Sequence, residues 1–140
     1  MGNKHSKLDQ QTTEFLLKNT KFSEKEIISY HRGFIKDFQK GITRTDFLQV
    51  FKNYFPFGDC SKYSANVFSI IDIDNDDLIS FKDFMHSLNI CLKEPFTEKI
   101  KFSFKMFDLD QDGYISRPEM LSVLESIYRC VGIYGIIRYE

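Results

Sequence analysis

The stretch that decides the fold runs from Asp108 to Glu119 and reads Asp-Leu-Asp-Gln-Asp-Gly-Tyr-Ile-Ser-Arg-Pro-Glu. Oxygen-bearing side chains occupy its first, third, fifth, ninth and twelfth positions, and glycine occupies the sixth, where such a loop needs a positive φ. This spacing is typical of a loop that offers Ca²⁺ the roughly six to eight oxygens it binds. An acidic solvated turn is the alternative, but it would match every position only by an improbable coincidence. The expected ligands are Asp108, Asp110, Asp112, the backbone carbonyl of Tyr114, Ser116 and the bidentate carboxylate of Glu119.

The same pattern recurs upstream, which indicates an internal repeat. Residues 72–83 read Asp-Ile-Asp-Asn-Asp-Asp-Leu-Ile-Ser-Phe-Lys-Asp, and their eighth residue, Ile79, precedes Ile115 by 36 positions. A third copy places Ile42 at 37 positions before Ile79. Each copy fits a helix, a loop and a second helix, which is the EF-hand unit. The predicted fold is therefore all-α, an EF-hand array with short β contacts between paired loops.

Two capping boxes mark helix starts in this repeat. Ser23 is followed three residues later by Glu26, and Ser116 by Glu119. In such a box each of the two side chains accepts a hydrogen bond from a backbone N–H group in the first turn of the helix. We therefore expect helices to begin beside Ser23 and Ser116.

The three loops are not equivalent as ion sites. Alignment of the first loop puts Ile35 at position one and Lys40 at position six, so we expect no calcium there. In the second loop Asp77 replaces the glycine, and the shorter Asp83 replaces the closing glutamate. Fewer ligand atoms in a tighter cavity favour the smaller Mg²⁺, so we predict a weak Ca²⁺ or Mg²⁺ site. Its expected ligands are Asp72, Asp74, Asp76, the backbone carbonyl of Leu78, Ser80 and Asp83.

The composition bounds the class of protein. The 140 residues are about one domain long, and 42% of them are apolar, including 15 Phe. The three cysteines, Cys60, Cys91 and Cys130, follow no metal-binding spacing, and we expect them to be reduced thiols of a cytosolic protein. No apolar run approaches the roughly 18 residues of a membrane-spanning helix.

The net charge of −1 hides an asymmetry. Nine of the 20 acidic residues but only two of the 19 Lys and Arg lie in the second and third loops, which leaves 11 acids and 17 Lys and Arg outside them. The surface outside the loops is therefore basic, which would suit anionic lipid or an acidic partner. A basic but merely solvated surface is an equally good interpretation.

The N-terminus carries a lipidation signal. The chain begins Met-Gly-Asn-Lys-His-Ser, which fits the pattern for N-myristoylation of Gly2 after removal of the methionine. One myristoyl chain gives only marginal membrane binding, so a second signal is needed. Lys4, Lys7, Lys18 and Lys21 are candidates for it. We expect a cytoplasmic protein with reversible, peripheral membrane association.

Taken together, these motifs resemble those of the neuronal calcium sensor family, most closely its frequenin branch. The resemblance implies a myristoylated calcium sensor with a disabled first hand, in which calcium exposes an apolar groove that binds an amphipathic helix of a target protein. Family targets include phosphatidylinositol 4-kinase, receptor kinases and channels. The segments that carry the resemblance begin at Met1, Phe22, Gly33, Phe55 and Phe107, and include Phe-Pro-Phe-Gly-Asp at 55–59.

The resemblance also implies which side chains line the groove, although any one of them could instead be a buried core residue. The tyrosine at position 30 stands where the family usually has tryptophan. The implied groove residues are Tyr30, Phe34, Phe47, Phe51, Tyr54, Phe55, Phe68, Phe81, Phe84 and Leu88.

The domain organisation follows from the repeat. We expect an N-terminal lipidation segment and first helix at 1–22, an EF-hand pair at 23–92, a third hand at 93–132 and a divergent tail at 133–140. Family members continue into a fourth hand, and we expect this chain to lack it, which would leave Ile115 without a partner and the stripe of Met120, Leu124 and Ile127 uncovered. A homodimer through the third hand is one expectation, and a truncated family product is another.

The motifs favour a calcium-dependent regulator over other classes. A Ca²⁺ or Mg²⁺ buffer and a constitutive membrane adaptor remain as alternatives. The three histidines, His5, His31 and His86, are isolated and accompany no catalytic motif, so we expect no enzyme activity. No nucleic-acid-binding motif is present either.

Overall fold

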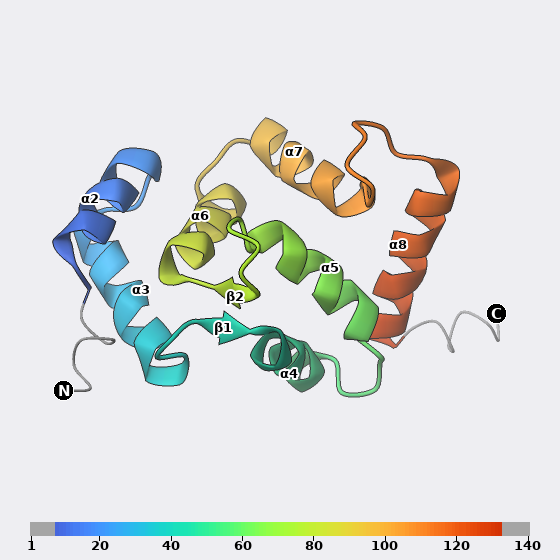
Figure 1. Cartoon of the computed structure of the whole chain (residues 1–140), viewed down its shortest axis with the longest axis horizontal. Helices are drawn as coiled ribbons and strands as arrows, with labels where there is room; N and C mark the ends of the chain where they lie inside the picture. The colour runs from blue at the N-terminus through green and yellow to red at the C-terminus, as the bar shows by residue number, and fades with distance from the viewer. Residues whose placement is uncertain (1–7, 133–140) are drawn as a thin grey trace. The chain divides into compact units, whose positions relative to one another are not determined.

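The computed structural model describes residues 8–132 and shows seven helices joined by short loops (Figure 1). The only β structure among these residues is a two-stranded sheet, so the prediction of an all-α fold with short β contacts is confirmed. The predicted lipidation residue Gly2 and the tail at 133–140 lie outside the described residues. The helices are α2 (Gln10–Asn19), α3 (Glu24–Asp37), α4 (Arg44–Tyr54), α5 (Ser61–Ile71), α6 (Phe81–Leu92), α7 (Phe96–Phe107) and α8 (Arg117–Val131), and the strands are β1 (Ile42–Thr43) and β2 (Leu78–Ile79).

Four helices start with the same capping box. In each box the N-cap residue is a serine or threonine whose side chain accepts a hydrogen bond from the backbone N–H of the third helical residue. That third residue is acidic, and its carboxylate accepts a hydrogen bond from the backbone N–H of the N-cap residue. The N-cap contact alone is worth about 1 kcal/mol. In three of these boxes the two residues are positions nine and twelve of an EF-hand loop, so the closing carboxylate is also the third residue of the exiting helix. The fourth box starts α3, the entering helix of the first repeat. The pairs are Ser23–Glu26, Thr43–Asp46, Ser80–Asp83 and Ser116–Glu119.

The contacts divide the chain into two units, the first of which comprises the described parts of 1–42 and 71–99. Helix α2 packs on α3 and α6, and Figure 1 shows the three together. The core of this unit is Leu16, Phe22, Ile27 and Met85, all at most 4% exposed. Strand β1 pairs with β2, as the repeat predicted for Ile42 and Ile79.

The second unit comprises 43–70 and the described part of 100–140, and it contains α4, α5, α8 and most of α7. Aromatic rings join α4 to α5: the ring of Phe47 lies 5.7 Å from that of Phe68, and the ring of Phe51 lies 5.7 Å from that of Tyr63. The guanidinium of Arg44 lies 4.5 Å from the centre of the Phe68 ring. The unit boundaries cut across all three repeats, and the domain limits predicted from the repeat stay predictions.

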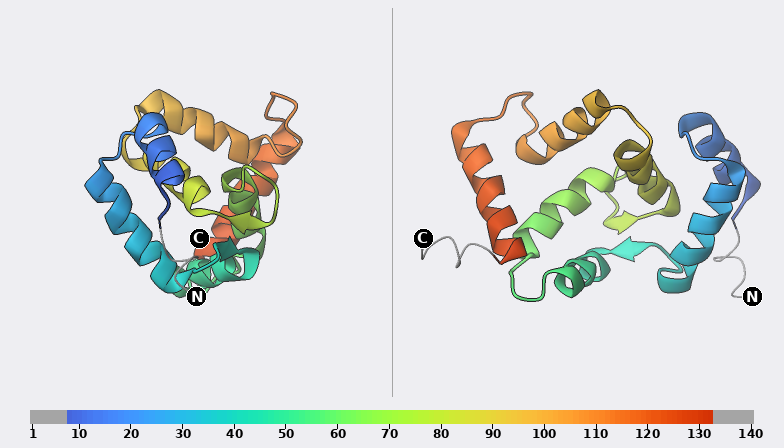
Figure 2. Two further views of the ribbon diagram at one scale, coloured as in Figure 1. Left: turned by 60° about the vertical axis from the view of Figure 1, so that its left-hand side comes forward. Right: turned by 180° about the vertical axis from the view of Figure 1, so that it is seen from behind.

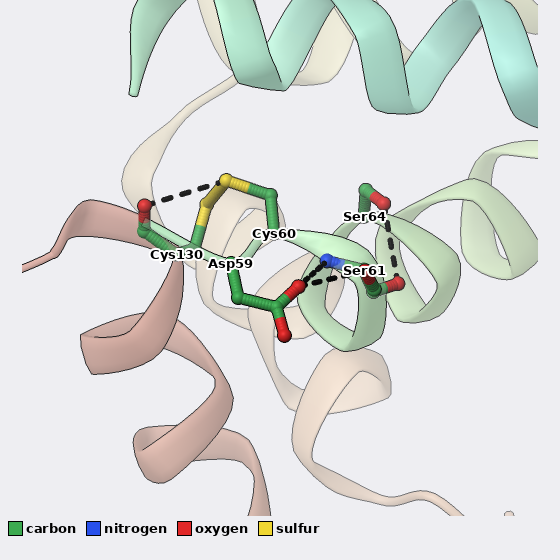
Figure 3. Close-up of a disulfide and its surroundings, with 5 residues drawn as sticks. All are labelled: Asp59, Cys60, Ser61, Ser64 and Cys130. Carbon is green, nitrogen blue, oxygen red and sulfur yellow. Dashed lines mark hydrogen bonds between the residues drawn. A yellow bond between two sulfur atoms is a disulfide. The ribbon is translucent and has the colours of Figure 1, made fainter. Parts of the chain in front are cut away.

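A disulfide between Cys60 and Cys130 ties the start of α5 to the last turn of α8 (Figure 3). The expectation of three reduced thiols was therefore wrong for these two, which are 1% and 0% exposed, whereas Cys91 is an exposed free thiol. The Asp59 N–H donates to the Arg129 carbonyl at 2.8 Å beside the bond. Both views of Figure 2 show this end of α8 beside the start of α5.

None of the helices between residues 8 and 132 is long and apolar enough to cross a bilayer.

Candidate metal centre

The third loop gathers four carboxylates at one point. Asp108, Asp110, Asp112 and Glu119 each offer an oxygen, and these four oxygens lie within 4.8 Å of one another. Within residues 8–132 no other group of three or more acidic, cysteine or histidine side chains converges in this way. Carboxylates this close repel one another unless a cation or a proton lies between them, so the arrangement suits a hard divalent cation.

The loop is already folded around its own carboxylates. Asp108, which is 6% exposed, accepts from the N–H groups of Asp112 at 3.2 Å and Gly113 at 2.9 Å. Asp112 in turn accepts from the Tyr114 N–H at 2.9 Å. Gly113 has a φ of 88°, the left-handed conformation that position six was expected to need. The backbone therefore holds the ligand positions in place, which reduces the ordering that binding an ion must bring about.

Glu119 connects the loop to α8. Its Oε1 accepts from the Ser116 N–H at 2.8 Å as part of the capping box, and its Oε2 accepts from the Asp110 N–H at 3.1 Å across the loop. The Ser116 bond is the main cause that lowers the pKa of Glu119 to about 2. Loss of hydration, followed by the hydrogen bond with Glu119, raises the pKa of Asp110 to about 6. The pair thus holds one proton at slightly acid pH, at the point where a cation would bind.

The second loop contains a buried carboxylate with one unsatisfied oxygen. Asp72 is 2% exposed; its Oδ2 accepts from the Asp77 N–H at 2.8 Å, but its Oδ1 has no hydrogen-bond partner. Burial raises the pKa of Asp72 and also that of Asp83, which is 5% exposed. An orphaned buried acceptor costs about 1–3 kcal/mol, more when charged, and a bound cation would remove that cost. The residues present therefore fit a metal ion at this loop.

The second loop is nevertheless less well arranged than the third. Its acidic side chains form no cluster within the distance that joins the third-loop carboxylates, so far as residues 8–132 are concerned. Asp77 at position six takes a φ of 63° without being a glycine. The Asp83 carboxylate accepts a hydrogen bond from the Ser80 N–H at 3.3 Å. The Glu119 carboxylate of the third loop, by contrast, also accepts from the Asp110 N–H on the other side of its loop. The roles predicted for Asp74, Asp76, Leu78 and Ser80 stay predictions.

The first loop supports the second through β1. Gly41, at the turn into β1, has a φ of 112°, and a Cβ there would lie 2.9 Å from the Ile79 carbonyl oxygen. Ile42 is 5% exposed and Ile79 is 1% exposed. The first repeat therefore contacts the second loop closely through backbone, while its own position one is the apolar Ile35.

The predicted groove residues of the first unit belong to one aromatic cluster. The Phe34 ring lies 5.4 Å from that of Phe81 and 5.3 Å from that of Phe84. Leu88 packs with these two phenylalanines against the core, and Tyr30 contacts the Phe22 ring at 5.6 Å. These side chains have a structural role here, and a groove role for them stays a prediction.

The remaining groove residues lie in the second unit. Phe47 contacts both Phe51, at 5.2 Å, and the buried Phe68. Phe55 is half-buried at the end of α4, and the adjacent Tyr54 is 77% exposed. The structure places these five residues on α4 and α5 and at their junction.

Sequence reasoning missed two loop residues with unusual backbone. Asn75 and Gln111 both have a φ of 57°, and both stand at position four of their loops. Asparagine commonly tolerates this conformation, which gave a signal at position 75, but glutamine has no such preference. The shared position identifies the turn as a property of the loop and not of either side chain.

Comparison with known proteins agrees with this geometry. A family model described as an EF-hand domain pair matches residues 62–125, which include the second and third loops. Neuronal calcium sensor 1 of Lymnaea stagnalis is 41% identical over 133 residues, which cover 94% of this chain and 70% of that protein. An identity of this size over almost the whole chain shows the family. The chain therefore belongs to the neuronal calcium sensor family.

Proposed function

We propose that this chain is a calcium sensor that binds Ca²⁺ in its third loop and responds by changing how it contacts a target protein. The observation that carries the proposal is the convergence of four carboxylate oxygens within 4.8 Å, in a loop folded by its own hydrogen bonds. Bound Ca²⁺ would supply the positive charge that these carboxylates lack. Asp108, Asp110, Asp112 and Glu119 would hold it, with the Tyr114 carbonyl and Ser116 as further ligands.

The response would start at Glu119. Its two oxygens now accept from the N–H groups of Ser116 and Asp110, and a cation would compete for both oxygens. Because Glu119 is the third residue of α8, moving its carboxylate moves the first turn of that helix. Met120 and Leu124 on α8 are 45% and 38% exposed, so a reoriented α8 would change an apolar surface. Sensor EF-hands act through such a change in helix orientation.

The second loop would be an additional, weaker Ca²⁺ or Mg²⁺ site. The unsatisfied Oδ1 of Asp72 supports an ion there. The strained Asp77 and the short Asp83 argue against tight Ca²⁺ binding.

The further parts of the proposal concern partners. An amphipathic helix of a membrane-associated target protein would bind to the predicted groove residues, and myristate on Gly2 would give peripheral membrane association from the cytoplasm. A homodimer through the third hand is proposed from the exposed apolar residues of α7 and α8, such as Ile100 and Leu121. We propose a regulator without enzyme activity and without nucleic-acid binding.

A calorimetric Ca²⁺ titration of wild type and of Glu119→Gln tests the third site. The variant keeps an acceptor for the Ser116 N–H but loses the charge, so the tight site should disappear. Glu125→Gln is the matched control, because Glu125 is an exposed acid on α8 that pairs with Arg129 at 3.0 Å. A dye that fluoresces on apolar surface distinguishes a sensor from a buffer, because only a sensor exposes more apolar surface when Ca²⁺ is added. Unchanged heat in Glu119→Gln would disprove the assignment of the site.

A further inference from the structure

A groove between α2 and α3 belongs to neither the calcium loops nor the aromatic clusters. It has a volume of about 820 Å³, within the range of ligand pockets of roughly 300–1,000 Å³. Its apolar side chains are Leu8, Leu17 and Ile28. Leu17 and Ile28 are each 43% exposed, although they belong to helices that bury Leu16 and Ile27 next to them. The α2–α3 groove thus offers apolar surface on the face that these helices turn away from their core.

Acidic side chains accompany this apolar surface. Asp9, Glu14 and Glu24 line the groove, and none of the lining residues that the structure describes is basic. Asp9 caps α2, because its carboxylate accepts from the Thr12 N–H at 2.6 Å, and this bond lowers its pKa. The positive charges of Lys82 and His31, which do not line the groove, also lower the pKa of Asp9. Glu14 and Glu24 are therefore the carboxylates best placed to pair with the positive charge of a ligand.

The negative charge of the groove lining is unusual for this chain. Outside the two ion-binding loops, Lys and Arg outnumber acids by 17 to 11, yet the described groove lining carries three acids and no base. An anionic membrane would be repelled here, and a partner with Lys or Arg beside apolar residues would be attracted. An amphipathic helix presents these two kinds of residue on adjacent faces.

We propose that the α2–α3 groove binds a basic amphipathic helix of a partner protein. Leu8, Leu17 and Ile28 contact its apolar face, and Glu14 and Glu24 face its Lys or Arg side chains. The groove lies in the first unit, whereas the third loop lies in the second. No residue of the groove lining belongs to the second or the third loop. We therefore expect binding here without Ca²⁺, in contrast to the Ca²⁺-dependent target binding proposed above, and it provides a second contact for a target.

The test uses a fluorescently labelled 18-residue helical peptide of Leu and Lys, with a peptide of Leu and Glu in the same pattern as its control. Anisotropy is measured with the full chain in chelator, where Ca²⁺-dependent target binding is absent. The Leu/Lys peptide should bind, and Glu14→Gln/Glu24→Gln should weaken it about tenfold, because each exposed charge pair contributes only modestly. Leu17→Ser should also weaken binding, because it removes an apolar contact of the groove without changing its charge.

A matched control is Asp37→Asn, which removes an exposed acid at the other end of α3 and should leave the affinity unchanged. Circular dichroism confirms that each variant is folded. Equal weakening by Asp37→Asn, or equal binding of the Leu/Glu peptide, would overturn the proposal. Tighter peptide binding after Lys4→Gln/Lys7→Gln would identify the chain's own first residues as the occupant and would also overturn it. Loss of Ca²⁺ binding in the calorimetric titration, with peptide binding retained in chelator, would refute the calcium site alone.

Discussion

Reduction of the Cys60–Cys130 disulfide should lower the free energy of unfolding of the second unit by about 4 kcal/mol. The two cysteines are 70 residues apart, so the bond closes a long loop in the unfolded chain. Loop closure of this length removes about 15 cal/mol/K of entropy from the unfolded state, which is about 4 kcal/mol at 25 °C. Total stabilities of small domains are about 5–15 kcal/mol, so the bond supplies a large share.

Thermal unfolding followed by far-UV circular dichroism, with and without a dithiol reductant, measures this effect. For a unit of this size we expect the midpoint to fall by about 20 °C on reduction. Cys60→Ser/Cys130→Ser should melt like the reduced protein in either buffer, and Cys91→Ser should melt like wild type because Cys91 is an exposed free thiol. Equal midpoints for oxidised and reduced wild type would refute the reasoning, as would a fall on reduction of the double variant.

Four further predictions follow from the loops and turns. Calcium must displace the proton that Asp110 holds below about pH 6, so Ca²⁺ affinity in calorimetry should fall about tenfold from pH 7 to pH 5 and should not change between pH 7 and 8. Gly113→Ala should lower the free energy of unfolding in urea denaturation by about 1–2 kcal/mol. The cost comes from the backbone conformation at a φ of 88°, because a Cβ at this position would contact nothing within 4 Å. Gly58→Ala should cost about 1–3 kcal/mol for the opposite reason, since its Cβ would collide with the Cys130 carbonyl; a loss below about 0.5 kcal/mol would contradict this. Asp83→Glu should raise Ca²⁺ affinity of the second loop about tenfold, because the longer side chain reaches the ion more easily.

The features that the sequence predicted well depend on residues that are close to one another along the chain. The third-loop pattern predicted its carboxylate cluster because ligands within twelve residues meet through local turns. The capping boxes at Ser23 and Ser116 were also predicted and are confirmed. Those at Thr43 and Ser80 were missed, because their third helical residue is aspartate where the usual pattern has glutamate or glutamine.

The features that sequence could not predict depend on long-range contacts. Nothing in the spacing of Cys60 and Cys130 indicates that α8 returns to the start of α5, because that approach depends on packing between distant helices. The division of the aromatic residues is of the same kind. Phe34 and Phe47 look alike in sequence, but they pack in different units.

Position twelve is where the three loops differ in the reach of the closing carboxylate. In the first and second loops Asp46 and Asp83 accept from the N–H of their own N-cap residues, at 3.2 and 3.3 Å, and their carboxylates stay at the start of the helix. Glu119 is one methylene longer, and it caps α8 with one oxygen while the other reaches the Asp110 N–H across the loop. The capping role therefore comes with the fold, because the same capping box is present in all three loops. A side chain that caps the helix and also spans the loop would link a bound cation to the start of the next helix. Of these three loops, only the third has such a side chain, Glu119.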